Sequence, residues 1–502
     1  MKKILNKSFK KIHFLIVFTL IFSGCDKGLE SININPNESV SNPSLDLLFG
    51  AIAPGFIGQT IDSYGITGHF CQQFANKNSD AGILNQDDDA RARRTWETAY
   101  SENNGALRNA TFLIYEAKNQ DNQVYQAIGK IYKVYMLSYI TDLFGDIPYE
   151  DAGQAFLFDD KSFLPKYDPQ EMVYKQMNDD LIAANEMLSS AEANQLIDED
   201  RDLLFQGDRL SWRKFANTLR LRLLMRSSNK QDVSSQIATI FSSPTEYPVL
   251  STIEEEPVFS YASSSDWLFY DNGTDDIYDR RISATAVDIM KGEGGDNKVS
   301  DVQDPRLSFL IDPTENSVNA GTPEFVGQPV GVATDNAPNA ERSLLSNNFT
   351  SLNKFWLITY AELLLIKAEA AHRGFITDDS KALTLAAVEA SIGRYGIDTN
   401  TTEAQSFLSS VGDNFDGNEL KTIAIQRWLN QINDGFEGYS VWRRMNFPTL
   451  TLGPDISVTQ IPTRYFYSSK TTDKNQANAD IAIARAPLNG QNTIYSKVWW
   501  DD

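Results

Sequence analysis

The chain has few of the residues that most often ligate metals or form cross-links. It contains two cysteines, Cys25 and Cys71, and three histidines in 502 residues. Two cysteines allow at most one disulfide. His69 and His372, the histidines beyond the amino-terminal leader, lie in distant parts of the sequence, so no Cys or His cluster has the spacing of a metal site. The sequence therefore predicts no metal and no cofactor.

Long hydrophobic runs and positive charge are also scarce. The apolar run at 14–22 is far shorter than the roughly 20 residues that a membrane-spanning helix needs. Acidic residues outnumber basic ones by 67 to 45, which gives a formal net charge of −22. Such a surface repels phosphate backbones, so nucleic acid is excluded as a partner.

The amino terminus reads as a secretory signal that ends at a cysteine. Five lysines precede the apolar run, and the small residues Ser23 and Gly24 stand directly before Cys25. This order is similar to a bacterial lipobox, in which the cysteine thiol receives a diacylglyceryl group and the peptide is cut before it. Phe22 departs from the leucine usual at that position. An ordinary signal peptide with a chance cysteine is the alternative.

Lipidation of Cys25 would have three consequences. Stable membrane attachment takes at least two acyl chains, and a lipoprotein cysteine carries three. Removal of residues 1–24 takes away five lysines and no acidic residue, so the net charge falls from −22 to −27. This surface also repels anionic lipid, which leaves the lipid tether as the main membrane contact. Cys71 would then have no disulfide partner.

The chain divides into a signal peptide at 1–24, a polar flexible leash at 25–44 and one large domain at 45–502. Helical periodicity dominates 45–242 and 354–502, whereas Gly, Pro, Ser, Asp and Asn are dense at 243–353. We expect a mainly α fold in which paired helices stack in the manner of tetratricopeptide units, with a loop-rich region that contains short strands.

Short sequence patterns predict the positions of several helices and strands. Apolar spacing predicts helices at 122–144, 212–225, 357–372 and 420–432, with one more at 283–290 inside the loop-rich region. Asp168, Pro169 and Glu171 form the pattern of a helix start, with Asp168 as the cap and Glu171 completing a capping box. Residues 257–259 and 325–326 are short apolar runs that suggest brief strands.

Two motif resemblances fail on inspection. "GEGGDN" (292–297) resembles a dinucleotide-binding loop but ends in Asn297 and follows no predicted strand, so it is a glycine-rich turn. "DNFDGNE" (413–419) resembles a calcium loop, yet counting back from Gly417 places Gly412 where the first aspartate is required.

Glu362 and Glu369 are the carboxylate pair to weigh as glycosidase catalysts. Seven residues apart on one helix, they would lie on the same face about 10.5 Å apart by helix rise, slightly beyond the separation of an inverting pair. The alanines around them suit close helix packing instead. Arg427, or Arg443 and Arg444, would neutralise the acids, and we favour this structural interpretation.

Aromatic residues in polar, loop-like surroundings are the remaining signal of a ligand site. Such rings offer apolar contact to the flat faces of sugars, while polar neighbours bind the hydroxyl groups. The cluster at 267–270 is the strongest candidate. The alternative for each ring is that it folds back into the core. The candidate glycan-binding residues are Trp267, Phe269, Tyr270, Tyr64 and Phe325.

An ordered set of motifs resembles the SusD/RagB family of surface nutrient-binding lipoproteins, in its divergent SusD-like branch. The motifs are "SININPN" (31–37), "TDLFGDIPYEDA" (141–152), "PKYDPQEMVYKQMNDDL" (165–181), "WRKFANTLRLRLLMR" (212–226), "DPRL" (304–307), "TYAELLLIKAEAAHRG" (359–374), "QRWLNQINDGFEGYSVWRRMNFP" (426–448), "IPTRYFY" (461–467) and "VWW" (498–500).

The resemblance implies a non-catalytic, mostly helical lipoprotein on the outer face of a Gram-negative outer membrane. It would form a lid over a TonB-dependent, SusC-like transporter barrel and hand oligosaccharide to it. Cys25 matches the family's lipidated residue, whereas no motif fixes the ligand contacts. Trp212, Asp146 and Trp442 are interpreted as structural. Oligopeptide or other nutrient capture on the same scaffold is the alternative, and a surface glycoside hydrolase is a third hypothesis from another class.

Overall fold

The structure is a computed structural model that describes residues 43–78, 89–100, 105–262 and 280–501. Leu45–Asp502 forms one compact unit, and Met1–Ser44 is a separate one. Cys25 and the leader lie outside the described residues. None of the described helices is both long and apolar enough to cross a membrane.

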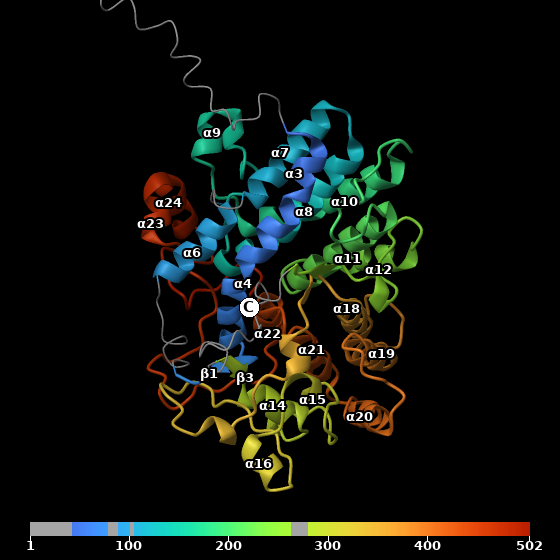
Figure 1. Ribbon diagram of the computed structural model, residues 1–502. Helices are drawn as coiled ribbons and strands as arrows, with labels where there is room; N and C mark the ends of the chain where they lie inside the picture. Colours follow the sequence, from blue (N-terminus) through green and yellow to red (C-terminus); the bar gives the residue numbers. More distant parts are fainter. Residues whose placement is uncertain (1–42, 79–88, 101–104, 263–279, 502) are drawn as a thin grey trace, which may run out of the picture. The chain divides into compact units, whose positions relative to one another are not determined.

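Long helices make up the first half of the described chain (Figure 1). The helices up to residue 242 are α3 (Leu45–Gly50), α4 (Ile52–Phe70), α6 (Asp89–Tyr100), α7 (Ala106–Asn119), α8 (Gln123–Phe144), α9 (Asp160–Phe163), α10 (Gln170–Ser190), α11 (Arg209–Ser227) and α12 (Ser234–Ser242), with the short 3₁₀ helix η1 (Ala155–Leu157).

The middle of the chain consists of short elements. They are η2 (Ile253–Glu255), β2 (Val258–Ser260), β3 (Arg280–Ile282), α14 (Ala284–Met290), η4 (Gly295–Asn297), α15 (Leu307–Leu310), α16 (Glu315–Asn319), η5 (Asn339–Glu341), α17 (Asn347–Thr350) and β4 (Lys354–Trp356). Helices return at the carboxyl end as α18 (Tyr360–His372), α19 (Ser380–Gly393), α20 (Thr402–Asp413), α21 (Glu419–Asn430), α22 (Gly435–Met445), α23 (Ser469–Thr472), η6 (Asp473–Asn475) and α24 (Gln476–Ala484).

Helices that follow one another in the chain pack as pairs. At the amino-terminal end α7 packs on α8, α8 on α10 and α10 on α11. At the carboxyl end α18 packs on α19 and on α21, and α21 packs on α22. Contacts of α11 with α18, and of α22 with α4, join the two sets. The expected mainly α scaffold of tetratricopeptide-like helix pairs is confirmed.

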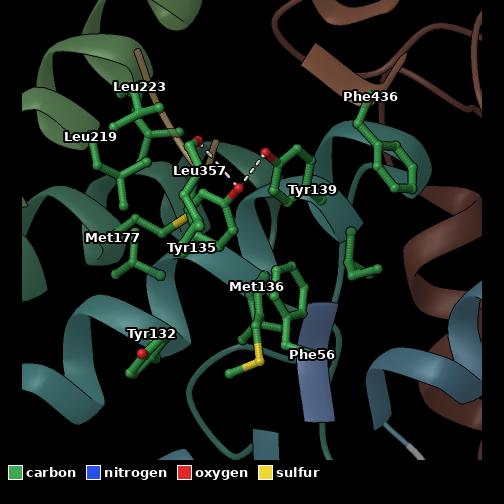
Figure 2. Packing of buried hydrophobic residues seen from close by; sticks show 14 of the residues in the cluster. Phe56, Tyr132, Tyr135, Met136, Tyr139, Met177, Leu219, Leu223, Leu357 and Phe436 are labelled. Carbon is green, nitrogen blue, oxygen red and sulfur yellow. Dashed lines mark hydrogen bonds between the residues drawn. The ribbon is translucent and has the colours of Figure 1, made fainter. Parts of the chain in front are cut away.

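Helix α8 is the centre of the core. Its start at Gln123 is capped by Asn122, whose side chain accepts a hydrogen bond from the Tyr125 N–H at 3.0 Å. All but three of its residues are buried, so the helix is enclosed on every side rather than on one stripe. Figure 2 shows Tyr135 among the packed side chains, with its hydroxyl 2.9 Å from that of Tyr139 and 3.2 Å from the Leu357 carbonyl oxygen.

The predicted cap of the next long helix is wrong. Helix α10 begins at Gln170, and the side chain that accepts its first N–H is Asp146, at 2.8 Å. Asp168 instead accepts the N–H groups of Tyr149 and Glu150, at 3.1 and 2.9 Å. Its own backbone bridges to Ile147, so the chain before α10 is tied to the "GDIPY" turn. This tertiary contact overrides the local capping pattern.

The loop-rich region holds the short strands. Strand β2 pairs antiparallel with β4, which confirms a strand near 257–259, and β1 (Phe74–Asn76) pairs antiparallel with β3. The predicted helix at 283–290 is α14, whose start is capped by Ser283. A strand at 325–326 is wrong, because Val326 bonds to Ser343 outside any strand. Short helices α15, α16 and α17 were not expected.

Candidate functional site

Most of the predicted glycan-binding aromatic side chains lie outside the part of the molecule that the structure describes. Trp267, Phe269 and Tyr270 lie outside the described residues. Tyr64 lies on helix α4, at a position whose side chain is likewise outside the description. Their role as a sugar platform therefore stays a prediction.

Phe325 is the one predicted aromatic whose surroundings are described. It is half-buried and packs against the main hydrophobic core, in the irregular chain between α16 and η5. This position corresponds to the alternative in which a loop aromatic folds back onto the core. A partly exposed ring can still offer an edge to a ligand, so ligand contact by Phe325 stays a prediction.

Two segments outside the description join the body at the same end of the β1–β3 sheet. Segment 263–279 rejoins the described chain at Arg280, the first residue of β3. In the antiparallel register Arg280 lies opposite Asn76, the last residue of β1, and segment 79–88 begins shortly after it. The described chain therefore breaks off and resumes at this sheet end.

Lys77 and polar side chains from the loop-rich region cluster at this sheet end, and we call them the sheet-end cluster. Arg281 Nη2 and Lys77 Nζ both donate to Asn339 Oδ1, at 2.6 and 2.7 Å. Arg281 Nη1 also donates to Gln328 Oε1 at 3.2 Å. The cluster consists of Lys77, Arg281, Gln328, Asp335, Asn339 and Arg342.

Asp335 connects the rest of the cluster. It accepts hydrogen bonds from Gln328 Nε2 at 3.1 Å and from Arg342 Nε at 2.8 Å, and its N–H donates to the Lys77 carbonyl oxygen. Burial would raise the pKa of Asp335, but the bond to Arg342 outweighs it and lowers the pKa below its ordinary value. The carboxylate is therefore charged at neutral pH and holds the loop from η5 onto the sheet.

Sequence reasoning missed this cluster. Lys77 and Asn339 are separated by 262 positions, and each stands in an unremarkable polar stretch. The turn-forming residues of "DNAPNAER" (335–342) were the only local sign of a fixed loop. A ligand held beside the cluster would find charged donors and acceptors of the kind that bind sugar hydroxyls.

The two glutamates weighed as catalysts are both fully buried in ion pairs. Glu362 accepts two hydrogen bonds from Arg222, at 2.7 and 2.6 Å, and one from Gln431 at 2.8 Å. Glu369 is bound by Arg444 at 2.7 Å. Neither carboxylate reaches solvent, so the structural interpretation of the pair is confirmed.

The environment of Glu369 is strongly cationic. Besides Arg444, its carboxylate contacts Arg373 Nε at 2.8 Å and Arg427 Nη1 at 3.4 Å. Burial raises the pKa of Glu369, but these guanidinium groups, led by Arg444, lower it to about 2. A general acid must hold a proton near neutral pH, and Glu369 cannot.

Arg443 was expected beside these acids, and that expectation is wrong. Its Nη1 donates to the carbonyl oxygens of Asp142 and Thr463, at 2.8 and 2.9 Å, because successive residues of α22 point in different directions and only Arg444 points toward Glu369. The partner that sequence reasoning missed is Arg222 of α11. It is 140 positions from Glu362, so no local pattern links them.

The residues interpreted as structural have structural contacts. Trp212 is fully buried, and its Nε1 donates to Asp202 at 2.8 Å. Asp146 binds the start of α10 and pairs with Arg485. Trp442 is half-buried and stacks on Tyr439, with ring centroids 5.9 Å apart.

Cys71 is a free thiol enclosed in the core. Burial raises its pKa to about 12, so the thiolate nucleophile is not populated near neutral pH. Among the residues that the structure describes, no group of three or more His, Cys, Asp or Glu side chains is placed to hold a metal ion.

Comparisons with known proteins show which family and which solved structures this chain is similar to. Residues 36–468 match the family model SusD-like, described as "Starch-binding associating with outer membrane". A solved chitin-binding protein is 25% identical with a TM-score of 0.75, over 91% of this chain and 100% of its own. No curated protein matches the sequence.

Other solved structures share the fold at lower identity. A SusD-like protein from Bacteroidetes is 22% identical with a TM-score of 0.73, over 92% of this chain and 100% of its own. A SusD homologue from Bacteroides fragilis is 20% identical with a TM-score of 0.70, over 91% of this chain and 99% of its own.

Proposed function

Because the chain belongs to the SusD-like family, we propose that it is a non-catalytic cell-surface lipoprotein that binds oligo- or polysaccharide. It delivers the glycan to a TonB-dependent outer-membrane transporter, over which it acts as a lid. The observation that carries the proposal is the family match over residues 36–468, together with a full-length structural likeness to a chitin-binding protein.

The arrangement of the chain supports capture and release. The paired helices form a rigid body, since their buried faces pack on one another along most of the chain. The proposed leash at 25–44 precedes α3, so the body would move on a lipidated Cys25 while it stays attached. A rigid binder on a slack tether is suited to opening and closing over a pore.

The proposed ligand site consists of Trp267, Phe269 and Tyr270, with the sheet-end cluster as a second source of polar contacts. The rings would supply flat apolar contact, and the cluster would supply hydrogen bonds to hydroxyl groups. Asn339 is exposed and Lys77 is half-buried, so polar atoms at this end of the sheet are accessible to a ligand.

Glu362 and Glu369, the carboxylates weighed as glycosidase catalysts, are not placed for catalysis, which supports binding rather than hydrolysis. Glu362 and Glu369 are neutralised by arginines in the core, and neither reaches a surface on which a glycosidic bond could lie. The hydrolase hypothesis would need another pair of acids.

Calorimetry of the soluble form, residues 26–502, against a glycan panel tests the proposal. The panel contains malto-oligosaccharides, chito-oligosaccharides and mixed plant glycans, and an oligopeptide mixture serves as the second arm. Saturable binding of one glycan class without release of products is expected. Binding of peptides alone would assign the scaffold to peptide capture, and glycan cleavage at enzymatic rates would refute the non-catalytic proposal.

A further inference from the structure

Residues 498–501 are buried in the core although they belong to no helix or strand, and we call them the Trp500 segment. The side chains of Val498 and Trp500 are fully enclosed and form part of the main hydrophobic cluster. The chain turns here, with the Asp501 N–H donating to the Val498 carbonyl oxygen at 3.2 Å. Irregular segments usually run over the surface of a protein, so the burial of this one points to a specific role.

The indole ring of Trp500 covers a group of buried charges. Its Nε1 donates to Asp142 Oδ1 at 2.7 Å. The guanidinium carbons of Arg443 and Arg226 lie 4.6 and 5.5 Å from the centroid of the ring. The same aspartate forms an ion pair with Arg226 and accepts a hydrogen bond from the Tyr174 hydroxyl at 2.5 Å. One apolar ring therefore lies against one carboxylate and two guanidinium groups.

The groups that the Trp500 segment contacts come from four helices of both helix sets. Asp142 is on α8 and Arg226 is on α11, in the amino-terminal set, whereas Arg443 is on α22, in the carboxyl-terminal set. The Trp499 N–H donates to Oε1 of Gln170, the first residue of α10, at 2.7 Å. The segment therefore connects the two sets where their buried charges meet.

The ring and the charges depend on each other. Burial raises the pKa of Asp142, although the neighbouring Arg226 opposes this shift, so removing this carboxylate from water is costly. The cost is offset by the ion pair, by the indole N–H and by the attraction of the guanidinium groups to the ring face. Before Trp500 is in place, its volume and its hydrogen bond are both missing, and the charges lack their final surroundings.

The order of the chain gives this contact a place in time. Trp500 follows Asp142 by 358 positions, and Trp499 follows Gln170 by 329. A chain is made from its amino terminus, and its earlier parts can fold while the later parts are still being made. The four helices are therefore complete before the segment that fills the space between their charges exists.

We propose that the Trp500 segment is a folding latch, without which the two helix sets do not reach their final packing. The body then closes only after residue 500 has been made and its ring has docked against Asp142, Arg226 and Arg443. This inference goes beyond the proposed function and depends on no ligand. Late closure would suit a chain that crosses a membrane unfolded, as the secretory signal expected at 1–24 implies.

The test uses the whole chain, residues 1–502, translated in vitro without membranes and held on the ribosome by a flexible linker and an arrest sequence. A short linker keeps residues 498–501 inside the exit tunnel, and a long linker places them outside. The measurement is the rate at which thermolysin cleaves the held chain. Trp500→Ala removes the ring, and Lys497→Ala is the matched control, because Lys497 is exposed beside the segment.

We expect the wild-type chain to be cleaved at least about tenfold faster on the short linker than on the long one, because cleavage follows the population of open chains. On the long linker, Trp500→Ala should remain as sensitive as the short-linker chain, and Lys497→Ala should resist cleavage like wild type.

Equal cleavage of the wild-type chain on both linkers would overturn the latch. It would also be overturned if Trp500→Ala resisted cleavage on the long linker as well as wild type does, since the helices would then close without the ring. Glycan binding enters neither comparison, so failure of the latch would leave the proposed function intact.

Discussion

Replacing Glu369 by glutamine would test whether the buried ion pairs stabilise the scaffold. Its carboxylate is fully buried among the guanidinium groups of Arg444, Arg373 and Arg427. Glutamine keeps the size of the side chain and one accepting oxygen, but it removes the charge. Three arginines would then face one another around an uncharged group in the core.

The expected loss follows from the pKa of Glu369. Its folded value is about 2 against an ordinary 4.5. This difference corresponds to about 3 kcal/mol of stability at neutral pH, within the 3–5 kcal/mol typical of breaking a buried pair. Because the folded pKa is depressed, this stability is present above pH 4.5 and is lost as the pH falls toward 2.

Urea unfolding at pH 7 and at pH 2.5 would measure both quantities. Glu369→Gln should lower the free energy of unfolding by about 3 kcal/mol at pH 7, and the difference from wild type should shrink at the lower pH. Glu389→Gln is the control, since Glu389 is exposed on the neighbouring helix α19. A loss below 1 kcal/mol at pH 7, or an equal loss at both pH values, would refute the reasoning.

Three further predictions concern other residues. Cys25→Ala should release the protein from membranes in a fractionation experiment, and continued membrane association would refute the anchor. Trp267→Ala should weaken glycan binding by about 1–3 kcal/mol in calorimetry, and unchanged affinity would remove it from the site. Burial raises the pKa of Glu256 from 4.5 to about 7, so the stability that this group costs grows as the pH rises from 4.5 to 7 and stays constant above 7. Glu256→Gln should therefore raise the unfolding free energy at pH 8 by about 3 kcal/mol but change little at pH 4.5, and the same effect at both values would contradict this.

The helices could be predicted where their signals are local. Helix α8 begins after Asn122 and ends at Phe144, as its apolar spacing and flanking residues indicate, and α21 and α14 lie within two residues of their predicted bounds. Periodicity and caps act over a few residues, so one sequence contains all the information they need.

Contacts between distant residues could not be predicted. Asp168 was the plausible cap of α10, yet it is occupied by the turn at Tyr149, and Asp146 takes its place. The sheet-end cluster could not be predicted for the same reason. Lys77 contacts Asn339 only after β1 and β3 have paired. The exposure of Phe158 could not be predicted either, since it depends on which surfaces the rest of the fold leaves uncovered.

The amino-acid sequence by itself determined the class of this protein. The lipobox-like pattern at Cys25, the helical periodicity and the ordered SusD-like motifs each depend on residues close together in the chain, and the net negative charge depends on composition alone. Only the tertiary structure decided which charges neutralise one another and which rings face solvent. Arg222 and Glu362 illustrate the reason, because a buried pair separated by 140 positions exists only once packing has excluded water from both.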